Sequence, residues 1–146
     1  MIRPLLPDDV DAVLDVWLRA SISAHAFMPP EHWQQRVPFV RDVCLPQCLT
    51  FVFVDDESGE IAGFASLLGE CLAGLFVAPA QQGRGIGSRL FGLARRICPA
   101  LHLTVYAENT RARAFYARQG LRVRESRRDA DTGHEELVMG LPAAAT

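Results

Sequence analysis

The sequence predicts a mixed α/β fold, in which one mostly antiparallel sheet carries helices on both faces. The hydrophobic pattern changes between helical and strand spacing in the order strand, two helices, three strands, helix, strand, helix, two strands. The three middle strands are joined by short turns, which suit antiparallel neighbours. With 146 residues, 49% of them hydrophobic, the chain is long enough to bury a core. We therefore expect one domain over residues 1–146.

The first third of the chain is predicted to hold a short edge strand and two helices. Residues 1–6 form the strand, and Pro7 with the two aspartates after it opens a helix over residues 8–20. Its apolar residues recur at helical spacing, at Val10, Val13, Leu14, Trp17 and Leu18. A second helix is expected over residues 31–46, kinked or split at Pro38.

The same reasoning places the rest of the secondary structure. The expected elements are a three-stranded meander over residues 48–78, a helix over 85–97, a strand over 101–107, a helix capped by Asn109 or Thr110 and ended by Gly120, and strands over 121–128 and 134–141. The last strand, HEELVMGL, is expected to be an edge strand that could support a dimer. The chain is thus predicted to be a monomer or a homodimer.

Bulk composition excludes several classes of function. The net charge of −2 gives no electrostatic basis for binding nucleic acid or an anionic membrane, and no apolar run is long enough to cross a bilayer. The N-terminus lacks a basic region followed by an apolar one, so we expect a cytoplasmic protein. Cys44 and Cys48 have no second cysteine or histidine pair at zinc-ligand spacing, so no metal site is expected.

Residues 75–89, LFVAPAQQGRGIGSR, combine a strand end, a glycine-rich turn and a helix start. This order exposes backbone N–H groups at the positive end of a helix, which favours a phosphate-bearing ligand. The turn is not a P-loop, because the chain contains no lysine. A dinucleotide fingerprint is disfavoured because Gly87 comes one residue early, and because too little chain follows Glu108 to complete a doubly wound sheet.

Gln82–Gly87 matches the pattern Q/R-x-x-G-x-G/A, the pyrophosphate loop of the GCN5-related N-acetyltransferases (GNAT). Asn109, Tyr116 and Gly120 follow in phase with that family, and the element order over residues 1–141 agrees with it. The chain therefore resembles the GNAT family. The resemblance implies a sheet with splayed central strands and helices on both faces. It also implies an N-acetyltransferase that uses acetyl-CoA by direct attack of an amine in a ternary complex.

The resemblance further assigns roles to residues around the loop. Backbone N–H groups of the loop would hold the pyrophosphate, with Arg84 or Arg89 adding charge. A backbone N–H near Phe76 would stabilise the oxyanion, and Tyr116 would protonate the leaving thiolate. Asn109 would cap its helix and could also touch the pantetheine. The acetyl-CoA-binding residues implied in this way are Leu75, Phe76, Val77, Gln82, Gly83, Arg84, Gly85, Ile86, Gly87, Ser88, Asn109 and Tyr116.

The acceptor amine is expected to bind on the irregular segment between the first two helices, with His25, Phe27 and Trp33. No carboxylate lies on the strand before the loop, so the general base stays open between Glu70 at the start of that strand, a water chain and His25. The acceptor is expected to be a small amine or an amino group of a peptide or protein. A coenzyme A-binding sensor or partner domain without strong catalysis is the alternative.

Overall fold

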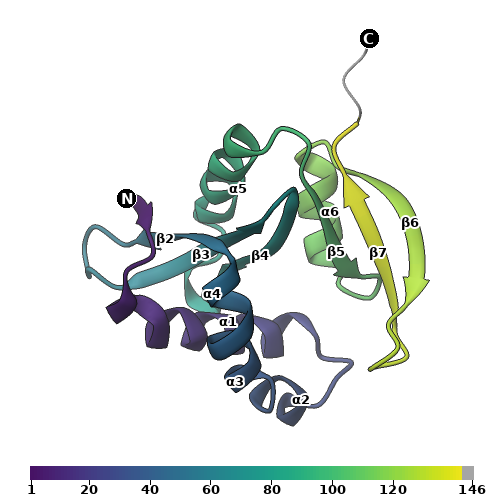
Figure 1. Ribbon diagram of the computed structural model, residues 1–146, viewed down its shortest axis with the longest axis horizontal. Coiled ribbons are helices and arrows are strands. Elements are labelled where there is room, and N and C mark those ends of the chain that lie inside the picture. The colour runs from purple at the N-terminus through teal and green to yellow at the C-terminus, as the bar shows by residue number, and fades with distance from the viewer. Residues whose placement is uncertain (143–146) are drawn as a thin grey trace.

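Seven strands pair into one sheet in the computed structural model, which describes residues 1–142 (Figure 1). The order across the sheet is β1-β2-β3-β4-β5-β7-β6, and every neighbouring pair is antiparallel except β4 and β5. The strands are β1 (Ile2–Pro4), β2 (Leu49–Val54), β3 (Ile61–Leu68), β4 (Cys71–Val77), β5 (His102–Tyr106), β6 (Arg122–Arg128) and β7 (Glu135–Gly140). The predicted mixed, mostly antiparallel sheet is thus confirmed.

The helices fall into an N-terminal group and two later single helices. They are the 3-10 turn η1 (Pro7–Asp9), α1 (Val10–Ala24), α2 (Pro30–Gln34), α3 (Val37–Phe39), the π-helical turn η2 (Val40–Cys44), α4 (Leu45–Gln47), the 3-10 turn η3 (Pro79–Gln81), α5 (Ile86–Ile97) and α6 (Thr110–Arg118). The expected helix over residues 31–46 is split, because Pro38 and Pro46 start new turns where no N–H donor is needed. Across residues 1–142, no helix has the length and apolar character needed to span a bilayer.

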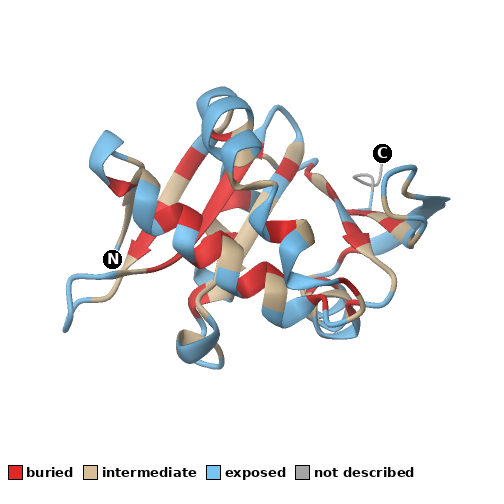
Figure 2. Ribbon diagram, turned by 90° about the horizontal axis from the view of Figure 1, so that it is seen from below, coloured by how far each residue is buried: buried red, intermediate tan, exposed pale blue. Residues whose placement is uncertain are grey.

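Helices cover both faces of the sheet and bury two separate clusters (Figure 1). On one face α5 and α6 pack against the sheet around Phe91, Leu103 and Tyr116. On the other face α1 and α2 pack around Val13, Trp17 and Phe64. Buried and exposed residues alternate along α1 (Figure 2), as expected for an amphipathic surface helix.

The sheet is open between its two central strands. β4 and β5 are the only parallel neighbours among the described strands, and they pair at one position, Cys71 with His102. By contrast, β5 pairs with β7 at five successive positions. Beyond Cys71 the two strands separate, so backbone groups on the facing edges of β4 and β5 are left for another partner. The splay implied by the family resemblance is present.

The expectation that the last strand forms a sheet edge is wrong. β7 pairs with β5 on one side and with β6 on the other, and β6 is the edge strand. The burial pattern gives the reason: Leu137 and Met139 of β7 are buried in the core, whereas every residue of β6 is exposed. The hairpin therefore folds its apolar strand inward and leaves the arginine-rich strand outside.

Candidate functional site

The separation of β4 from β5 opens a cleft of about 790 Å³. Its walls come from the C-terminal end of α1, β4, the glycine-rich loop, β5 and α6. These segments are distant in sequence and meet at the place where the sheet is unpaired. A ligand in this cleft would therefore contact both halves of the molecule.

The glycine-rich loop forms one end of the cleft and fits an anion. Gly83 and Gly85 adopt left-handed backbone conformations, with φ of +83° and +81°, which L side chains rarely adopt. The loop leads directly into α5 at Ile86, so the unpaired N–H groups of the first helical turn face the same end. Gln82 fixes the loop to β4, because its Nε2 donates a hydrogen bond to the carbonyl oxygen of Val77 at 3.0 Å.

The arginines predicted beside this loop do not line the cleft. Arg84 pairs with Asp55 at 3.8 Å, and the guanidinium of Arg89 lies over the ring of Phe53 at 5.0 Å on the other side of α5. The cleft is instead lined by Arg111 and Arg118 of α6. Their spacing of seven residues puts them on one helix face, a signal that was present in the sequence.

The direction of the β4 backbone decides which N–H groups face the cleft. The N–H of Ala78 donates a hydrogen bond to the carbonyl oxygen of Ala62 on β3 at 2.8 Å. Backbone groups of alternate residues in a strand point to the same side, so the N–H of Phe76, two residues earlier, also points toward β3. A Cβ atom at Gly63 of β3 would lie 2.8 Å from the carbonyl oxygen of Phe76, which confirms that side. The alternate residues Leu75 and Val77 therefore direct their N–H groups toward β5 and the cleft. The backbone N–H near Phe76 that was predicted to face the cleft is therefore that of Leu75 or Val77, not that of Phe76 itself.

Tyr116 lies on the cleft wall formed by α6 and is only 9% exposed. Its ring packs against Phe115 at 5.3 Å and Phe91 at 6.2 Å between centroids. Burial raises the pKa of its hydroxyl, which forms no hydrogen bond with any residue in the described range 1–142. Tyr116 therefore presents a protonated hydroxyl that is free to act as a donor.

Asn109 is the N-cap of α6, as predicted. Its Oδ1 accepts a hydrogen bond from the N–H of Ala112 at 3.2 Å. Its Nδ2 lies 3.5 Å from Nε2 of His25, so the cap also connects the two halves of the molecule across the cleft. Both groups line the cleft.

The aromatic residues predicted for the acceptor gather around His25, where the chain leaves α1 and meets the end of β5, and this region is the aromatic end of the cleft. The ring of His25 stacks on Trp33 at 4.6 Å, and Tyr106 meets the same imidazole edge-on at 5.5 Å. Phe27 contacts His25 and Tyr106 from the margin at 5.6 and 5.8 Å. Nδ1 of His25 donates to the carbonyl oxygen of Ser21 at 2.7 Å, and burial lowers the pKa of the ring, so a neutral imidazole presents Nε2 as an acceptor.

Glu70 lies outside the cleft. It is exposed in the turn between β3 and β4, and its backbone carbonyl accepts a hydrogen bond from the N–H of His102 at 2.9 Å. The cleft is lined instead by Glu108, just after β5, and Glu136 of β7. Neither was predicted as a site residue, because both lie far in sequence from the glycine-rich loop. Within the described residues no three histidine, cysteine or acidic side chains are grouped to hold a metal ion.

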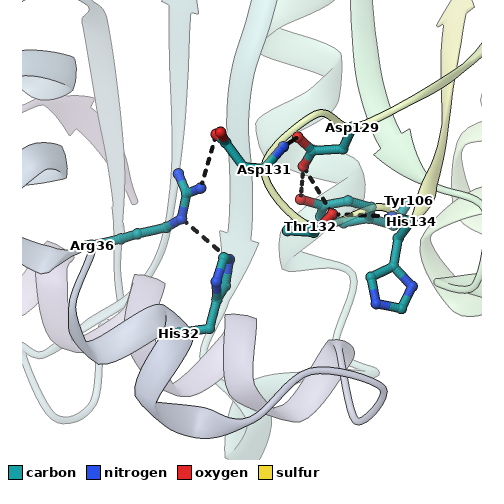
Figure 3. Close-up of polar contacts among 7 residues, drawn as sticks. All are labelled: His32, Arg36, Tyr106, Asp129, Asp131, Thr132 and His134. Carbon is teal, nitrogen blue, oxygen red and sulfur yellow. Dashed lines mark hydrogen bonds and ion pairs between the residues drawn. The ribbon is translucent and has the colours of Figure 1, made fainter.

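The β6–β7 loop reaches over to the aromatic end of the cleft (Figure 3). The hydroxyl of Tyr106 donates to Oδ2 of Asp129 at 2.5 Å, and the hydroxyl of Thr132 donates to the same oxygen at 3.1 Å. Burial, followed by this hydrogen bond, raises the pKa of Tyr106 to about 12. Arg36 of the α2–α3 segment pairs with Asp131 of the loop at 3.5 Å. The sequence DADTG had indicated only a turn.

Comparison with known proteins identifies the relatives of this chain. The sequence profile of the Acetyltransferase (GNAT) family matches residues 17–121. The peptidyl-lysine N-acetyltransferase YiaC of Escherichia coli strain K12 is 33% identical over 147 aligned residues, which cover 100% of this chain and 99% of that protein. The peptidyl-lysine N-acetyltransferase YjaB of Salmonella typhimurium is 31% identical over 122 residues, or 84% of this chain and 83% of the relative.

Solved structures show the same fold. The solution structure of apo YjaB from Escherichia coli superposes with a TM-score of 0.84, covers 99% of this chain and 98% of its own, and is 26% identical. The PaiA N-acetyltransferase of Thermoplasma acidophilum, solved in complex with coenzyme A, has a TM-score of 0.79 at 18% identity, with 97% of each chain covered. The second likeness concerns the fold alone.

Proposed function

This chain belongs to the acetyltransferase (GNAT) family, and from that premise we propose that its acceptor is the side-chain amine of a lysine in a protein. The chain is an N-acetyltransferase that uses acetyl-CoA as co-substrate. The observation that carries the proposed acceptor is the full-length similarity to a peptidyl-lysine N-acetyltransferase. The aromatic end of the cleft agrees with it, because aromatic rings beside carboxylates suit a long apolar stem that ends in a cation.

Acetyl-CoA fits the residues that line the cleft. The N–H groups of residues 83–88 and the positive end of α5 are proposed to hold the pyrophosphate, with Arg111 and Arg118 adding charge from α6. The cleft-facing N–H groups of Leu75 and Val77 are proposed to pair with the pantetheine arm as a neighbouring strand would. Gln82 supports these contacts indirectly, because it anchors the loop to Val77.

Residues of both cleft walls then serve the transfer of the acetyl group. An N–H of Leu75 or Val77 is proposed to stabilise the negative charge that develops on the thioester oxygen as the amine attacks. Tyr116 is proposed to give its proton to the departing thiolate, which suits a buried hydroxyl that stays protonated. His25 and Trp33 are proposed to position the acceptor, with Phe27 at the margin.

A coenzyme A-binding domain without catalysis finds no support in the comparisons. The residues 1–146 are proposed to act as one domain, as a monomer or a homodimer. A cytoplasmic location belongs to the same proposal, since the four cysteines are free thiols, as is usual in a reducing compartment.

Acetylation of a peptide library tests the acceptor. Purified protein, acetyl-CoA and peptides with one internal lysine are expected to release coenzyme A, and mass spectrometry is expected to find the acetyl group on the lysine side chain. Matched peptides with arginine in place of lysine and a blocked N-terminus serve as controls. Release of thiol with free small amines only, and with none of the lysine peptides or intact protein substrates, would contradict the proposed acceptor.

A further inference from the structure

The lysine amine needs a proton acceptor, and β4 supplies none. A lysine side chain has a pKa of about 10.4 in water and arrives as an ammonium ion, which must lose a proton before its nitrogen can attack. The residues of β4 that line the cleft, 72–77, have no ionisable side chain. Two carboxylates line the cleft, Glu108 and Glu136.

Glu108 is poorly placed for this role. It follows the end of β5, its side chain is 50% exposed, and its Oε1 lies 2.7 Å from Nδ1 of His134. His134 in turn packs against Phe27 at 4.9 Å between ring centroids. The carboxylate of Glu108 is thus tied to the β6–β7 loop at the mouth of the cleft.

Glu136 of β7 also lines the cleft and is more buried than Glu108. It pairs with Tyr106 in the β5–β7 ladder, so the two side chains lie on the same face of the sheet. Tyr106 is in ring contact with His25, and this face is therefore the acceptor end of the cleft. The Glu136 side chain is only 18% exposed, and Nε of Arg127 donates to its Oε1 at 2.8 Å. Within residues 1–142 its Oε2 has no hydrogen-bond partner.

We propose that Glu136 binds the ammonium group of the acceptor and takes its proton. This proposal rests on the proposed transfer to lysine. One N–H bond of the ammonium breaks and its proton passes to Oε2 of Glu136. The freed electron pair forms the bond from nitrogen to the thioester carbon, the carbon–sulfur bond breaks, and Tyr116 protonates the sulfur. The second proton lost by the nitrogen restores Tyr116, and Glu136 returns its proton to water, so each turnover releases one proton.

The arrangement around Glu136 supports this role in two ways. Arg127 holds one carboxylate oxygen and balances its charge, and its second guanidinium nitrogen also donates to the hydroxyl of Thr104 on β5 at 3.4 Å. Because Arg127 belongs to the edge strand β6, it binds the carboxylate on the side away from α1. The other carboxylate oxygen, Oε2, remains available to bind a cation that enters the cleft beside Tyr106.

A pair of matched substitutions tests the proposal. Glu136→Gln keeps the size of the side chain and removes its charge, and it is expected to lower kcat/KM for a lysine peptide about 10²-fold at pH 7. The loss is expected to become smaller as the pH rises toward the pKa of lysine, because more of the amine is then already neutral. For the same reason it is expected to be smaller for a peptide that carries the less basic aminoethylcysteine in place of lysine. Glu108→Gln, the matched control, is expected to stay within about threefold of wild type. Coenzyme A affinity by calorimetry is expected to be unchanged in both.

A merely structural role would give a different pattern. Equal losses at every pH and for both amines, or no loss at all, would overturn the role of Glu136. Glu136→Asp, which keeps the carboxylate, is expected to retain the wild-type pH profile at lower activity, and it serves if Glu136→Gln does not fold. If wild type acetylates small amines and no lysine, the proposed acceptor fails, and the same comparison with the best small amine still decides the role of Glu136.

Discussion

Tyr116 is a residue at which core packing and chemistry meet. Its ring belongs to the cluster under α5 and α6, while its hydroxyl reaches the cleft. Tyr116→Phe keeps the ring and removes the proton donor, so kcat is expected to fall about 10²-fold or more. Stability is expected to change little, because the hydroxyl has no hydrogen-bond partner among residues 1–142. Thiol release measures the rate, and a thermal melt serves as the control. Unchanged turnover would remove Tyr116 from the proton transfer.

Asp129 gives the β6–β7 loop a dependence on pH. The hydrogen bond from Tyr106 lowers the pKa of this carboxylate, so it is ionised more readily in the folded protein than in the unfolded chain, where its value is about 3.9. Its stabilisation is therefore complete above the unfolded value and is lost as the pH falls through the lower folded value. Asp129→Asn is expected to lower the free energy of unfolding by about 1 kcal/mol at pH 7.

Urea denaturation at several pH values measures this effect. The difference between wild type and Asp129→Asn is expected to be constant from pH 7 to 5 and to narrow below about pH 4. Asp131→Asn is the matched control in the same loop, because Asp131 is 76% exposed and pairs with Arg36 at 3.5 Å, and little change is expected there. A difference that stays the same down to pH 3 would contradict the role of the Asp129 charge.

At the scale of elements, the glycine-rich loop depends on backbone conformation rather than on side-chain contacts. A Cβ at Gly85 would meet no atom within 4 Å, yet its φ of +81° is strained for alanine by about 1–2 kcal/mol. Gly85→Ala is therefore expected to weaken coenzyme A binding about tenfold, measured by calorimetry. Gly92→Ala in α5 is the control: its Cβ also meets no atom within 4 Å, and alanine favours the helix. Equal affinities of both variants would contradict the strain argument.

Most elements could be predicted from the sequence because their signals are local. Three of these signals each involve only a few neighbouring residues: the apolar spacing of α1, the proline that splits residues 31–46, and the cap at Asn109. The helix α1 extends past the expected end at residue 20 to Ala24, because Ser21 is still buried against the sheet. Tertiary packing decides such ends, and no local signal marks them.

The errors at the site also have a common physical cause. The direction of the Phe76 N–H depends on the register of β4 with β3, and the exposure of Glu70 depends on where the turn before β4 falls. The place of β7 inside the sheet depends on its pairing with β5. Each of these features depends on pairing between distant segments. A shift of the register by one residue would turn the groups that face the cleft to the opposite side of the strand. The cofactor loop was predictable because a short contiguous segment forms it.

At the scale of the whole molecule, a ligand in the cleft completes the sheet. β4 and β5 are joined at one pair, so the cleft-facing N–H groups of Leu75 and Val77 have no strand partner and are expected to exchange their hydrogens quickly in the free protein. Phe76 points its N–H toward β3 and is expected to exchange slowly throughout. Coenzyme A at saturating concentration is expected to slow exchange at Leu75 and Val77 and to leave Phe76 unchanged.

Hydrogen exchange measured residue by residue by NMR separates this mechanism from a general stiffening of the protein. The N–H of Val54 donates to the carbonyl oxygen of Met1 at 2.8 Å, far from the cleft along the sheet, and it serves as the reference. Slowing at Leu75 and Val77 without a change at Val54 would show that coenzyme A acts as the missing strand between the two halves. Slowing at Phe76 alone would reverse the assignment of the cleft-facing N–H groups. Uniform slowing at all four positions would instead mean that binding suppresses global unfolding, which requires no contact with β4.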